Sequence, residues 1–401
     1  MTRIGIHDLA VATTHHVVEL DDLAEAAGVD PAKYRLGLGQ ERMSFPAPDD
    51  DVVTIGAAAA APILERHGAD GIRTVLFATE SGVDQSKSGG VFVHRLLGLP
   101  PTVRTVELKQ ACYGGTAALQ TALGIVARDP RERVLVISSD IARYELDSPG
   151  EPTQGAAAVA MLVSADPDIL EIEPIAGVNT TDVDDFWRPT DSTTAIVDGA
   201  LSLDAYLHSV TGAWDDYRAQ GGPDVDEIHR FVYHQPFTKM ARKAHAHLAA
   251  HTGVELPVET LETSFRYNRV LGNSYTASLF VGLAAVLDHE DDLAGTRIGL
   301  FSYGSGSVSE IITGIVQDGY REHSRRDETA AALAARVRLP LDDYRALHAA
   351  TTTSSADVET PHVTTRPYRF AGVRGRARHY EPTTTPATAE RETVEPASAD
   401  R

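Results

Sequence analysis

Residues 106–123, "VELKQACYGGTAALQTAL", contain the one cysteine of the 401-residue chain. The segment before Cys112 has the composition of a strand, and the segment after it, rich in alanine and leucine, predicts a buried helix. A side chain at such a strand-to-helix turn faces solvent or a cavity, and the free amides and dipole of a helix N-terminus stabilise a thiolate. Gly114 and Gly115 would let a substrate approach the backbone closely. Cys112 is therefore a candidate nucleophile; the alternative is the small buried hydrophobic residue that most free cysteines are.

Outward from this stretch, short apolar strands alternate with helical segments along most of the chain. We expect strands at residues 3–13, 72–79, 133–140, 229–235 and 297–304. We expect helices at residues 20–28, 52–68, 115–127, 278–290, 326–337 and 341–350. This alternation predicts parallel sheets that are covered on both faces. The second half repeats the scheme of the first, which is an apolar strand, a polar turn with a reactive residue, and a helix rich in small residues.

The composition limits the class of protein. Hydrophobic residues make up 42% and charged residues 23% of the chain, which is typical of globular proteins. The net charge of −21 argues against nucleic acid or an anionic membrane as a partner, because a basic surface is missing. The apolar runs are too short to cross a bilayer, and the N-terminus lacks a secretory pattern, so we expect a cytoplasmic protein. An anionic ligand would need positive charge supplied locally.

Two more polar residues follow predicted strands. Glu80 ends the strand at 72–79, where a carboxylate is either exposed or partly buried with a raised pKa that suits a base. His234 ends another strand and is either a satisfied core histidine or a general base or hydrogen-bond donor to a carbonyl. In such sheets ligands bind beyond the carboxyl ends of the strands. Glu80, Cys112 and His234 are therefore candidates for one site.

A helix is expected after His234, and it carries two pairs of residues spaced four apart. Lys239 and Lys243 share one face, which is either a solvated surface or an anion clamp in this acidic protein. His247 and His251 have a spacing that suits a metal, but no acidic or thiol partner is nearby in the sequence. We therefore expect no metal site there.

Two small-residue loops complete the candidates. Asn273 lies in "RVLGNSYTAS" and is either a helix N-cap or a site residue. The segment "SYGSGSVSE", residues 302–310, is either an ordinary turn of small residues or a turn whose backbone amides form an oxyanion hole.

Taken together, seven segments resemble the hydroxymethylglutaryl-CoA synthase family of the thiolase-like superfamily. They are "ATESGVDQSKS", "ELKQACYGGTAAL", "SSDIARYELDSPGEPTQGAAAVAML", "DDFWRP", "VYHQPFTKMARKA", "RYNRVLGNSYTASL" and "FSYGSGSVSE". The resemblance is to the bacterial branch and covers roughly residues 1 to 381. It implies an α/β fold of the thiolase-like five-layered α/β/α/β/α type, built from two similar halves, and a homodimer.

This resemblance also implies a division of the chain. We expect an N-terminal half at 1–165 with Glu80 and Cys112, a C-terminal half at 166–325 with His234 and Asn273, and a helical and loop extension at 326–381 that packs on the core. The composition of residues 382–401, which is poor in large apolar side chains, predicts a disordered tail.

The resemblance implies roles for the site residues. Cys112 would be the acylated nucleophile, Glu80 the general acid/base, and His234 the partner of the second substrate's carbonyl. The positions that match the family's pocket and CoA contacts are Thr153, Lys239, Lys243, Asn273 and Ser305. The implied reaction condenses acetyl-CoA with acetoacetyl-CoA and water to hydroxymethylglutaryl-CoA for the mevalonate pathway. The CoA thioesters are substrates, and we expect no cofactor and no metal.

Three alternatives stay open. A β-branching synthase of polyketide assembly would use the same three residues with substrates on a carrier protein. A type III ketoacyl synthase would pair His with Asn, without a Glu at position 80. A non-catalytic thiolase-like scaffold would have no reason to keep Glu80, Cys112 and His234 together.

Overall fold

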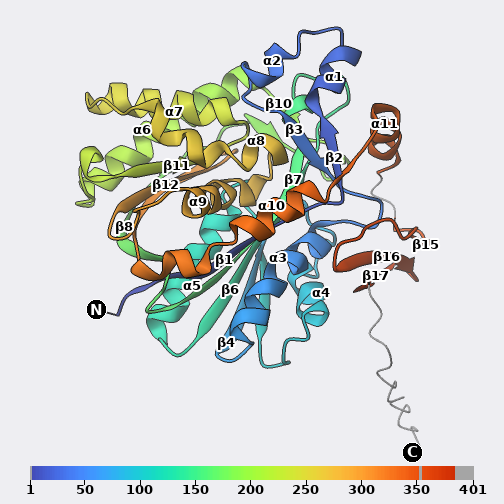
Figure 1. Ribbon diagram of the computed structural model, residues 1–401, viewed down its shortest axis with the longest axis horizontal. Helices are drawn as coiled ribbons and strands as arrows, with labels where there is room; N and C mark the ends of the chain where they lie inside the picture. The colour runs from blue at the N-terminus through green and yellow to red at the C-terminus, as the bar shows by residue number, and fades with distance from the viewer. Residues whose placement is uncertain (1, 352–354, 384–401) are drawn as a thin grey trace, which may run out of the picture.

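The computed structural model describes residues 2–351 and 355–383 (Figure 1). The tail expected at 382–401 lies almost wholly outside these residues, and Pro382 is the last residue of a strand. No helix of the described segments is long and apolar enough to cross a membrane.

The predicted strands and helices are present, together with several that the sequence did not indicate. The strands are β1 (Ile4–Thr13), β2 (His16–Glu19), β3 (Arg42–Phe45), β4 (Ile72–Ala78), β5 (Arg104–Leu108), β6 (Arg133–Ala142), β7 (Gly155–Ala165), β8 (Leu170–Thr180), β9 (Phe186–Trp187), β10 (Ile196–Val197), β11 (Arg230–Tyr233), β12 (Arg297–Gly304), β13 (Val308–Val316), β14 (Val337–Arg338), β15 (Val358–Glu359), β16 (Tyr368–Arg374) and β17 (Ala377–Pro382). The α-helices are α1 (Leu20–Ala26), α2 (Ala32–Arg35), α3 (Val52–His67), α4 (Gly89–Leu96), α5 (Gly114–Arg128), α6 (Gly199–Ala219), α7 (Thr238–Thr252), α8 (Asn268–Leu271), α9 (Ser278–His289), α10 (Arg326–Ala334) and α11 (Leu341–Ala350). The 3₁₀ helices are η1 (Glu151–Thr153), η2 (Val225–Glu227), η3 (Val258–Phe265), η4 (Tyr275–Ala277) and η5 (Asp318–His323).

One large sheet runs through both halves of the described chain, in the order β11-β12-β13-β8-β1-β7-β6-β4-β5. In the first half β4 and β6 are parallel, whereas β6–β7 and β7–β1 are antiparallel. In the second half β11 and β12 are parallel, whereas β12–β13 and β13–β8 are antiparallel. Four strands of each half therefore have the same order and directions, whereas the edge strand β5 has no counterpart among the described residues. The two halves meet where β1 pairs with β8.

The expectation of purely parallel sheets is wrong. The strands β7, β8 and β13 were not predicted, and each pairs antiparallel with its sheet neighbours. The connection from β12 to β13 spans only residues 305–307. So short a turn can join only antiparallel neighbours, because a parallel crossover needs a dozen or more residues. The sheet is therefore mixed.

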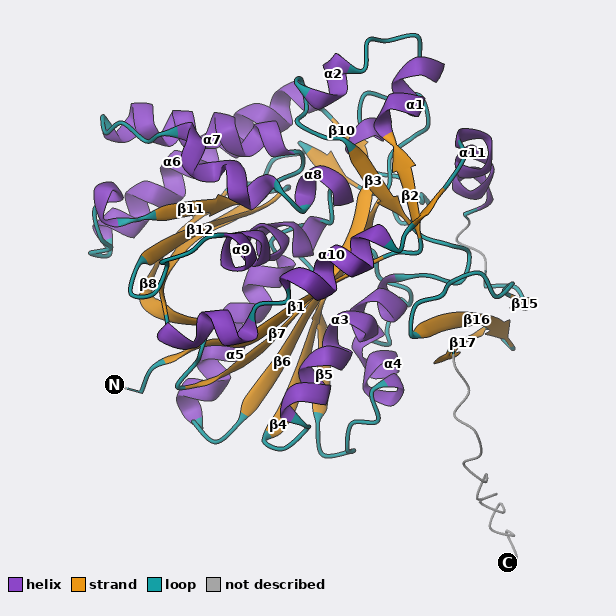
Figure 2. Ribbon diagram, viewed as in Figure 1, coloured by secondary structure: helices purple, strands orange, loops and turns teal. Residues whose placement is uncertain are grey.

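The helices form three layers (Figures 1 and 2). One layer lies between the two halves of the sheet, and the other two cover the outer faces of these halves. The helices α5 and α9 share one core with inward residues of β4, β6, β7 and β12. The helix α3 packs on the opposite face of the first half, and α6 and α7 pack on the second. In β6, Val134 and Val136 face the central core, whereas Leu135 and Ile137 face α3. Burial of both faces explains the apolar run of residues 134–137 in this strand.

The segment after β13 wraps back onto the first half. The short strand β14 pairs with β2, and the hairpin of β16 and β17 packs against α3 and α4 (Figure 1). Tyr380 in β17 donates a hydrogen bond to Asp51 Oδ2, 2.7 Å away, and Arg378 donates to the same oxygen. Asp51 is also the N-cap of α3, so one carboxylate caps a helix and anchors the hairpin.

Candidate active site

The structure brings Glu80 and Cys112 into direct contact. In the parallel pair β4–β5, Ala78 at the end of one strand lies opposite Leu108 at the end of the other. Both strands leave the sheet at the same edge, and the chain reaches Glu80 and Cys112 shortly afterwards. The Cys112 thiol donates a hydrogen bond to Glu80 Oε1, and the two atoms are 3.4 Å apart. The candidate nucleophile and the candidate base thus share one site.

The surroundings of this pair favour the protonated form of both groups. Burial, and next the nearby charge of Asp140, raise the pKa of Glu80 to about 8. Burial also raises the pKa of the Cys112 thiol well above its usual value, and Glu80 and Asp140 raise it further. The sequence led us to expect a thiolate, and this expectation is wrong for the resting state, in which the thiol is favoured. The dipole of α5 does not lower the pKa of the thiol, because this helix begins at Gly114, beyond Cys112. Two carboxylates lie close to the sulfur and raise its pKa.

Asp140, which the sequence analysis missed, fixes the turn that carries Glu80. This fully buried carboxylate lies in β6, next to β4. Its Oδ1 accepts hydrogen bonds from the Thr79 hydroxyl at 2.8 Å and from the backbone amides of Glu80 and Ser81 at 2.9 Å. Its Oδ2 accepts from the amide and hydroxyl of Thr276 in η4. A charged residue near the end of an otherwise apolar strand was the signal that could have revealed it.

His234 is buried at the end of β11. Its backbone amide donates to Phe301 O at 2.8 Å, and its carbonyl accepts from the Tyr206 hydroxyl at 2.7 Å. Burial lowers the pKa of His234 to about 3, so its imidazole is neutral at physiological pH. Burial raises the pKa of Tyr206, and Cys112 is close enough to contribute to that shift. Tyr206 therefore links His234 to the surroundings of the thiol.

Asn273 and Thr153 meet at the same site from different halves of the chain. The Asn273 amide donates to Thr153 O at 3.2 Å, and Asn273 Oδ1 accepts from the Tyr275 amide at 2.9 Å. Tyr144 and Tyr275 form a small apolar cluster against which Cys112 packs. Burial raises the pKa of both tyrosines, with contributions from Cys112 and Glu80. No local pattern in the sequence distinguishes these two aromatic residues as candidates.

Ser305 lies in the turn between β12 and β13, and this turn rests on the segment that carries Cys112. The Gln110 side chain donates a hydrogen bond to Ser305 O at 3.3 Å. A Cβ atom at Gly304 would lie 2.5 Å from Gln110 O and 2.6 Å from Tyr113 N. Only glycine therefore allows this close approach of the two segments.

The segment "DDFWRP" connects this turn to the Glu80 loop. Asp185 is buried and accepts hydrogen bonds from the Gly306 amide and the Tyr303 hydroxyl, both at 2.8 Å. The Arg188 guanidinium donates to the backbone carbonyl of Glu80. Its charge also opposes the rise in the pKa of Glu80.

Gly115 has a different role from the one that we expected. A Cβ atom there would lie 2.5 Å from Thr276 O and 2.6 Å from Ser138 Oγ. The glycine lets α5 pack against η4 and β6, and protein atoms fill the space that we had assigned to substrate. At Gly114 the nearest atom to a Cβ is Thr276 Cγ2, at 3.3 Å. The expectation of close substrate approach at these glycines is therefore not met.

The two lysines lie on the first turns of α7, which begins shortly after His234. Lys239 is half-buried, and its Nζ donates to Leu36 O at 3.4 Å, whereas Lys243 is exposed. The Lys239 backbone amide also donates to Leu38 O at 3.0 Å. The start of α7 therefore lies against the segment after α2.

Comparisons with known proteins agree with this geometry. The hydroxymethylglutaryl-coenzyme A synthase N-terminal family matches residues 2–168, and the corresponding C-terminal family matches residues 171–263 and 254–352. The hydroxymethylglutaryl-CoA synthase of Enterococcus faecalis is 41% identical over 358 residues, which are 88% of this chain and 94% of that protein. The polyketide biosynthesis 3-hydroxy-3-methylglutaryl-ACP synthase PksG of Bacillus subtilis is 32% identical over 373 residues, which are 86% of this chain and 88% of that protein.

A solved structure supports the same assignment. "MvaS in complex with 3-hydroxy-3-methylglutaryl coenzyme A" is 38% identical and superposes with a TM-score of 0.88, covering 95% of this chain and 99% of that chain. This likeness confirms the thiolase-like fold built from two similar halves. The sequence and structural matches together show that the chain belongs to the hydroxymethylglutaryl-CoA synthase family.

Proposed function

We propose that this protein condenses acetyl-CoA with acetoacetyl-CoA and water to hydroxymethylglutaryl-CoA and CoA, through an acetyl group carried on Cys112. The observation that carries the proposal is the 3.4 Å contact between the Cys112 thiol and Glu80. Membership of the family supports the reaction type, an acyl transfer followed by a carbon–carbon condensation.

In the first step the Cys112 sulfur attacks the carbonyl carbon of acetyl-CoA. The sulfur–carbon bond to CoA breaks, and the thiol proton ends on the CoA that leaves. Covalent capture divides a difficult condensation into easier steps. Backbone amides at Cys112 and around Ser305 would hold the thioester oxygen as it becomes negative. The hydrogen bond from the Gln110 side chain to Ser305 O, which joins these two segments, supports this role.

In the second step Glu80 removes a proton from the methyl group of acetyl-Cys112. The resulting enolate attacks the ketone carbon of acetoacetyl-CoA, and the neutral imidazole of His234 donates a hydrogen bond to the ketone oxygen. Glu80 then returns its proton to the alkoxide. A carboxyl group with a pKa of about 8 suits both directions of this transfer near neutral pH. Water finally hydrolyses the thioester and restores the Cys112 thiol.

The CoA portion of the substrates would bind beside α7. Lys239 and Lys243 supply positive charge in a protein whose net charge is −21. Thr153 and Asn273 would line the acyl pocket beside Cys112. The mevalonate pathway, a homodimer and the division at residues 165 and 325 are further parts of this proposal, and they rest on the family resemblance. The cytoplasmic location is also part of it and rests on the sequence pattern.

The direct test uses the purified protein with acetyl-CoA and then acetoacetyl-CoA. Intact-protein mass should rise by one acetyl group with acetyl-CoA alone, and Cys112→Ser should show no adduct. Addition of acetoacetyl-CoA should discharge the adduct and yield hydroxymethylglutaryl-CoA with release of free thiol. If the wild type binds acetyl-CoA but forms no adduct, the scaffold alternative stands in place of the enzyme.

A second candidate is a carrier-protein-dependent synthase, which the 32% identity to PksG favours. The two candidates differ in the form in which acetoacetate is delivered. Turnover of acetoacetyl-CoA should be compared with turnover of acetoacetate on a carrier protein. A strong preference for the carrier-bound form would replace the CoA assignment.

A further inference from the structure

A second group of ionisable side chains lies at the opposite end of the sheet. It consists of His7, Asp8, His67, Asp168 and His323, joined by Arg66 and Arg325. The strand register gives the distance of this group from the proposed active site. Ile6 in β1 pairs with Val163 in β7, and Val163 pairs with Val134, so the group lies level with the start of β6. Asp140 lies six residues further along β6, which corresponds to about 20 Å. The proposed reaction makes no use of this group.

A β-bulge in β1 aims two successive side chains into the group. The register with β7 shifts between Ile6 and Asp8, so His7 is the extra residue. Neighbouring residues of a regular strand point to opposite faces, but a bulge re-aims a side chain. His7 and Asp8 both approach His67 and His323: the ring centroids of His7 and His67 are 5.0 Å apart, and Asp8 Oδ2 lies 2.9 Å from His67 Nε2.

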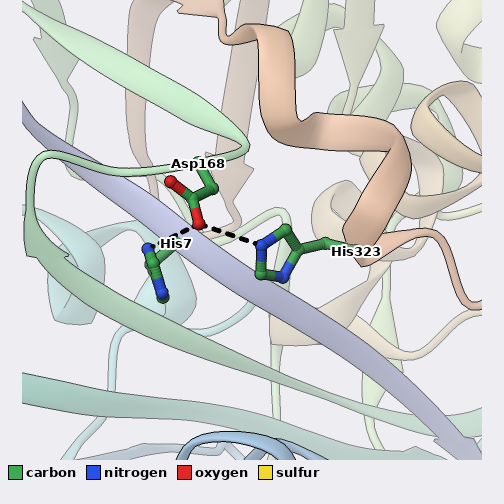
Figure 3. Close-up of side chains that lie close together, drawn as sticks. All are labelled: His7, Asp168 and His323. Carbon is green, nitrogen blue, oxygen red and sulfur yellow. Dashed lines mark hydrogen bonds and ion pairs between the residues drawn. The ribbon is translucent and has the colours of Figure 1, made fainter.

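Three atoms of this group converge with the spacing of metal ligands (Figure 3). Asp168 Oδ2 lies 3.6 Å from His7 Nδ1 and 3.1 Å from His323 Nε2, and the three atoms lie within 4.8 Å of one another. Ligand atoms around a tetrahedral Zn²⁺ with bonds near 2.1 Å are separated by roughly 3.4 Å. His7 Nδ1 is buried and makes no hydrogen bond within the described residues, so a ring nitrogen pointing at the carboxylate is unsatisfied.

We propose that His7, Asp168 and His323 bind a divalent transition metal ion, with Zn²⁺ as the best match. Two imidazole nitrogens and one carboxylate oxygen are the donors that Zn²⁺, Co²⁺ and Ni²⁺ prefer, whereas Mg²⁺ and Ca²⁺ prefer oxygen donors alone. A fourth position is left for water.

The buried Asp8 supports this site rather than forming it. His323 Nδ1 lies 3.6 Å from Asp8 Oδ1 and 3.3 Å from an Arg66 guanidinium nitrogen. With a metal on Nε2, the Nδ1 proton would be donated to Asp8, which would then orient the ring. A second set with suitable spacing in the described segments is Asp8, His67 and His323. Arg325 donates to Asp8 Oδ2 at 2.7 Å, and Arg66 lies 3.3 Å from the same oxygen. Two guanidinium groups already neutralise Asp8, so a cation is better placed at His7, Asp168 and His323.

The three ligands come from segments that are distant in sequence. His7 is in β1, Asp168 is in the turn between β7 and β8, and His323 ends η5. The pairing of β1 with β8, which joins the two halves of the sheet, lies beside them. A bound metal would therefore fasten the end of the second half to the junction, and its expected effect is on stability.

The test uses the full chain without an affinity tag, stripped with EDTA and dialysed. Calorimetric titration should show one Zn²⁺ bound per chain, and Co²⁺ should give the visible absorption of a low-symmetry site. Zn²⁺ at about 100 times its Kd should raise the Tm by about 3 °C, whereas Mg²⁺ should not raise it. Because the readouts are binding and Tm, they do not depend on the proposed condensation activity.

Matched variants separate this site from adventitious binding. His7→Gln and Asp168→Asn each alter a half-buried side chain, and each should weaken Zn²⁺ binding at least about tenfold. His251→Ala is the control, because His251 Nε2 forms a similar contact with Asp215 Oδ1 at 2.6 Å that the sequence did not reveal. That variant should bind Zn²⁺ within about twofold of the wild type.

Two results would overturn the proposal. The first is an EDTA-stripped protein that shows neither heat of Zn²⁺ binding nor a rise in Tm, which would leave the group as an ion-pair network alone. The second is Zn²⁺ binding that survives both His7→Gln and Asp168→Asn, which would place the metal elsewhere.

Discussion

Two carboxylates, Glu80 and Asp8, lie near opposite ends of the same sheet and have opposite pKa shifts. Burial raises the pKa of Glu80 to about 8, and the neighbouring Asp140 adds to the rise. Burial would also raise the pKa of Asp8, but His323 and the charge and hydrogen bond of Arg325 lower it well below its usual value. Glu80 has one guanidinium nearby, Arg188, and that group donates to the backbone carbonyl of Glu80.

The difference shows how one fold keeps one carboxyl group ready for proton transfer and another permanently charged. Burial raises the pKa of both groups, so burial alone cannot explain why their shifts are opposite. The deciding factor is whether cations contact the carboxylate oxygens directly. Asp8 has two such contacts, whereas the Glu80 oxygens face a thiol. This comparison predicts that Glu80 matters for chemistry and Asp8 for stability.

Replacement of Glu80 should have the largest effect on activity. Glu80→Ala should lower the condensation rate roughly 10²–10⁴-fold, because no base remains to form the enolate. Acylation should continue, since Glu80 raises the pKa of the Cys112 thiol and its removal lowers that pKa. Intact mass should show acetyl-enzyme accumulating while product formation stops. The base assignment fails if this variant loses acylation but still condenses from preformed acetyl-enzyme.

Replacement of Asp8 should affect stability instead. Asp8→Asn leaves Arg325 buried without its charged partner, and we expect a loss of about 3–5 kcal/mol in the free energy of unfolding. Urea denaturation measures this loss, and kcat at saturating substrate should stay near the wild-type value. The control is Asp21→Asn, which breaks the exposed Asp21–Arg35 pair and should leave unfolding unchanged. An Asp8 variant as stable as the wild type would contradict the assigned role.

The two carboxylates should also give opposite dependences of stability on pH. The folded-state pKa of Glu80 is above its unfolded value, so its ionisation destabilises the fold as pH rises from about 4.5 to 8. The folded-state pKa of Asp8 is depressed, so its stabilising effect is present above about pH 4 and is lost as pH falls below that value. Glu80→Gln should therefore gain on the order of 2–4 kcal/mol over the wild type at pH 8, and little at pH 4. Urea denaturation at both pH values measures the gain, and an equal gain at both would refute the raised pKa.

The sequence predicted the parts of this comparison that depend on local pattern. The strands β4 and β6 are continuous apolar runs, so they were identified, and their position explains why Glu80 lies at the sheet edge. The strand β7, "GAAAVAMLVSA", was missed because a run of alanines does not distinguish a strand from a helix. The same omission led to the wrong expectation of a parallel sheet.

Protonation states could not be predicted, because they depend on residues from distant segments. Cys112 was expected as a thiolate from its position before a helix, but Glu80 and Asp140 come from other strands and reverse that expectation. Asp140 was missed because its role consists of accepting hydrogen bonds from Glu80, Ser81 and Thr276, which meet only in the folded chain. The contact of Cys112 with Glu80 could be anticipated, since both follow strands.

The smallest effect on activity is expected for Lys239 and Lys243, two cations that lie at a distance from Glu80. Asp8 has guanidinium groups bound to it, whereas the ammonium groups of Lys239 and Lys243 lie on the first turns of α7, one half-buried and the other exposed. Lys239→Ala combined with Lys243→Ala should raise KM for CoA esters roughly tenfold and leave kcat nearly unchanged, because the lost attraction is the same in ground and transition states. The wild-type KM should rise with salt more steeply than that of the double variant, since exposed charges are screened within about 10 Å at 0.1 M salt. Unchanged kinetics and an unchanged salt dependence in the double variant would show that CoA binds elsewhere. The two lysines would then have no role at the site, and only the guanidinium groups bound to Asp8 would remain as cations with an assigned effect.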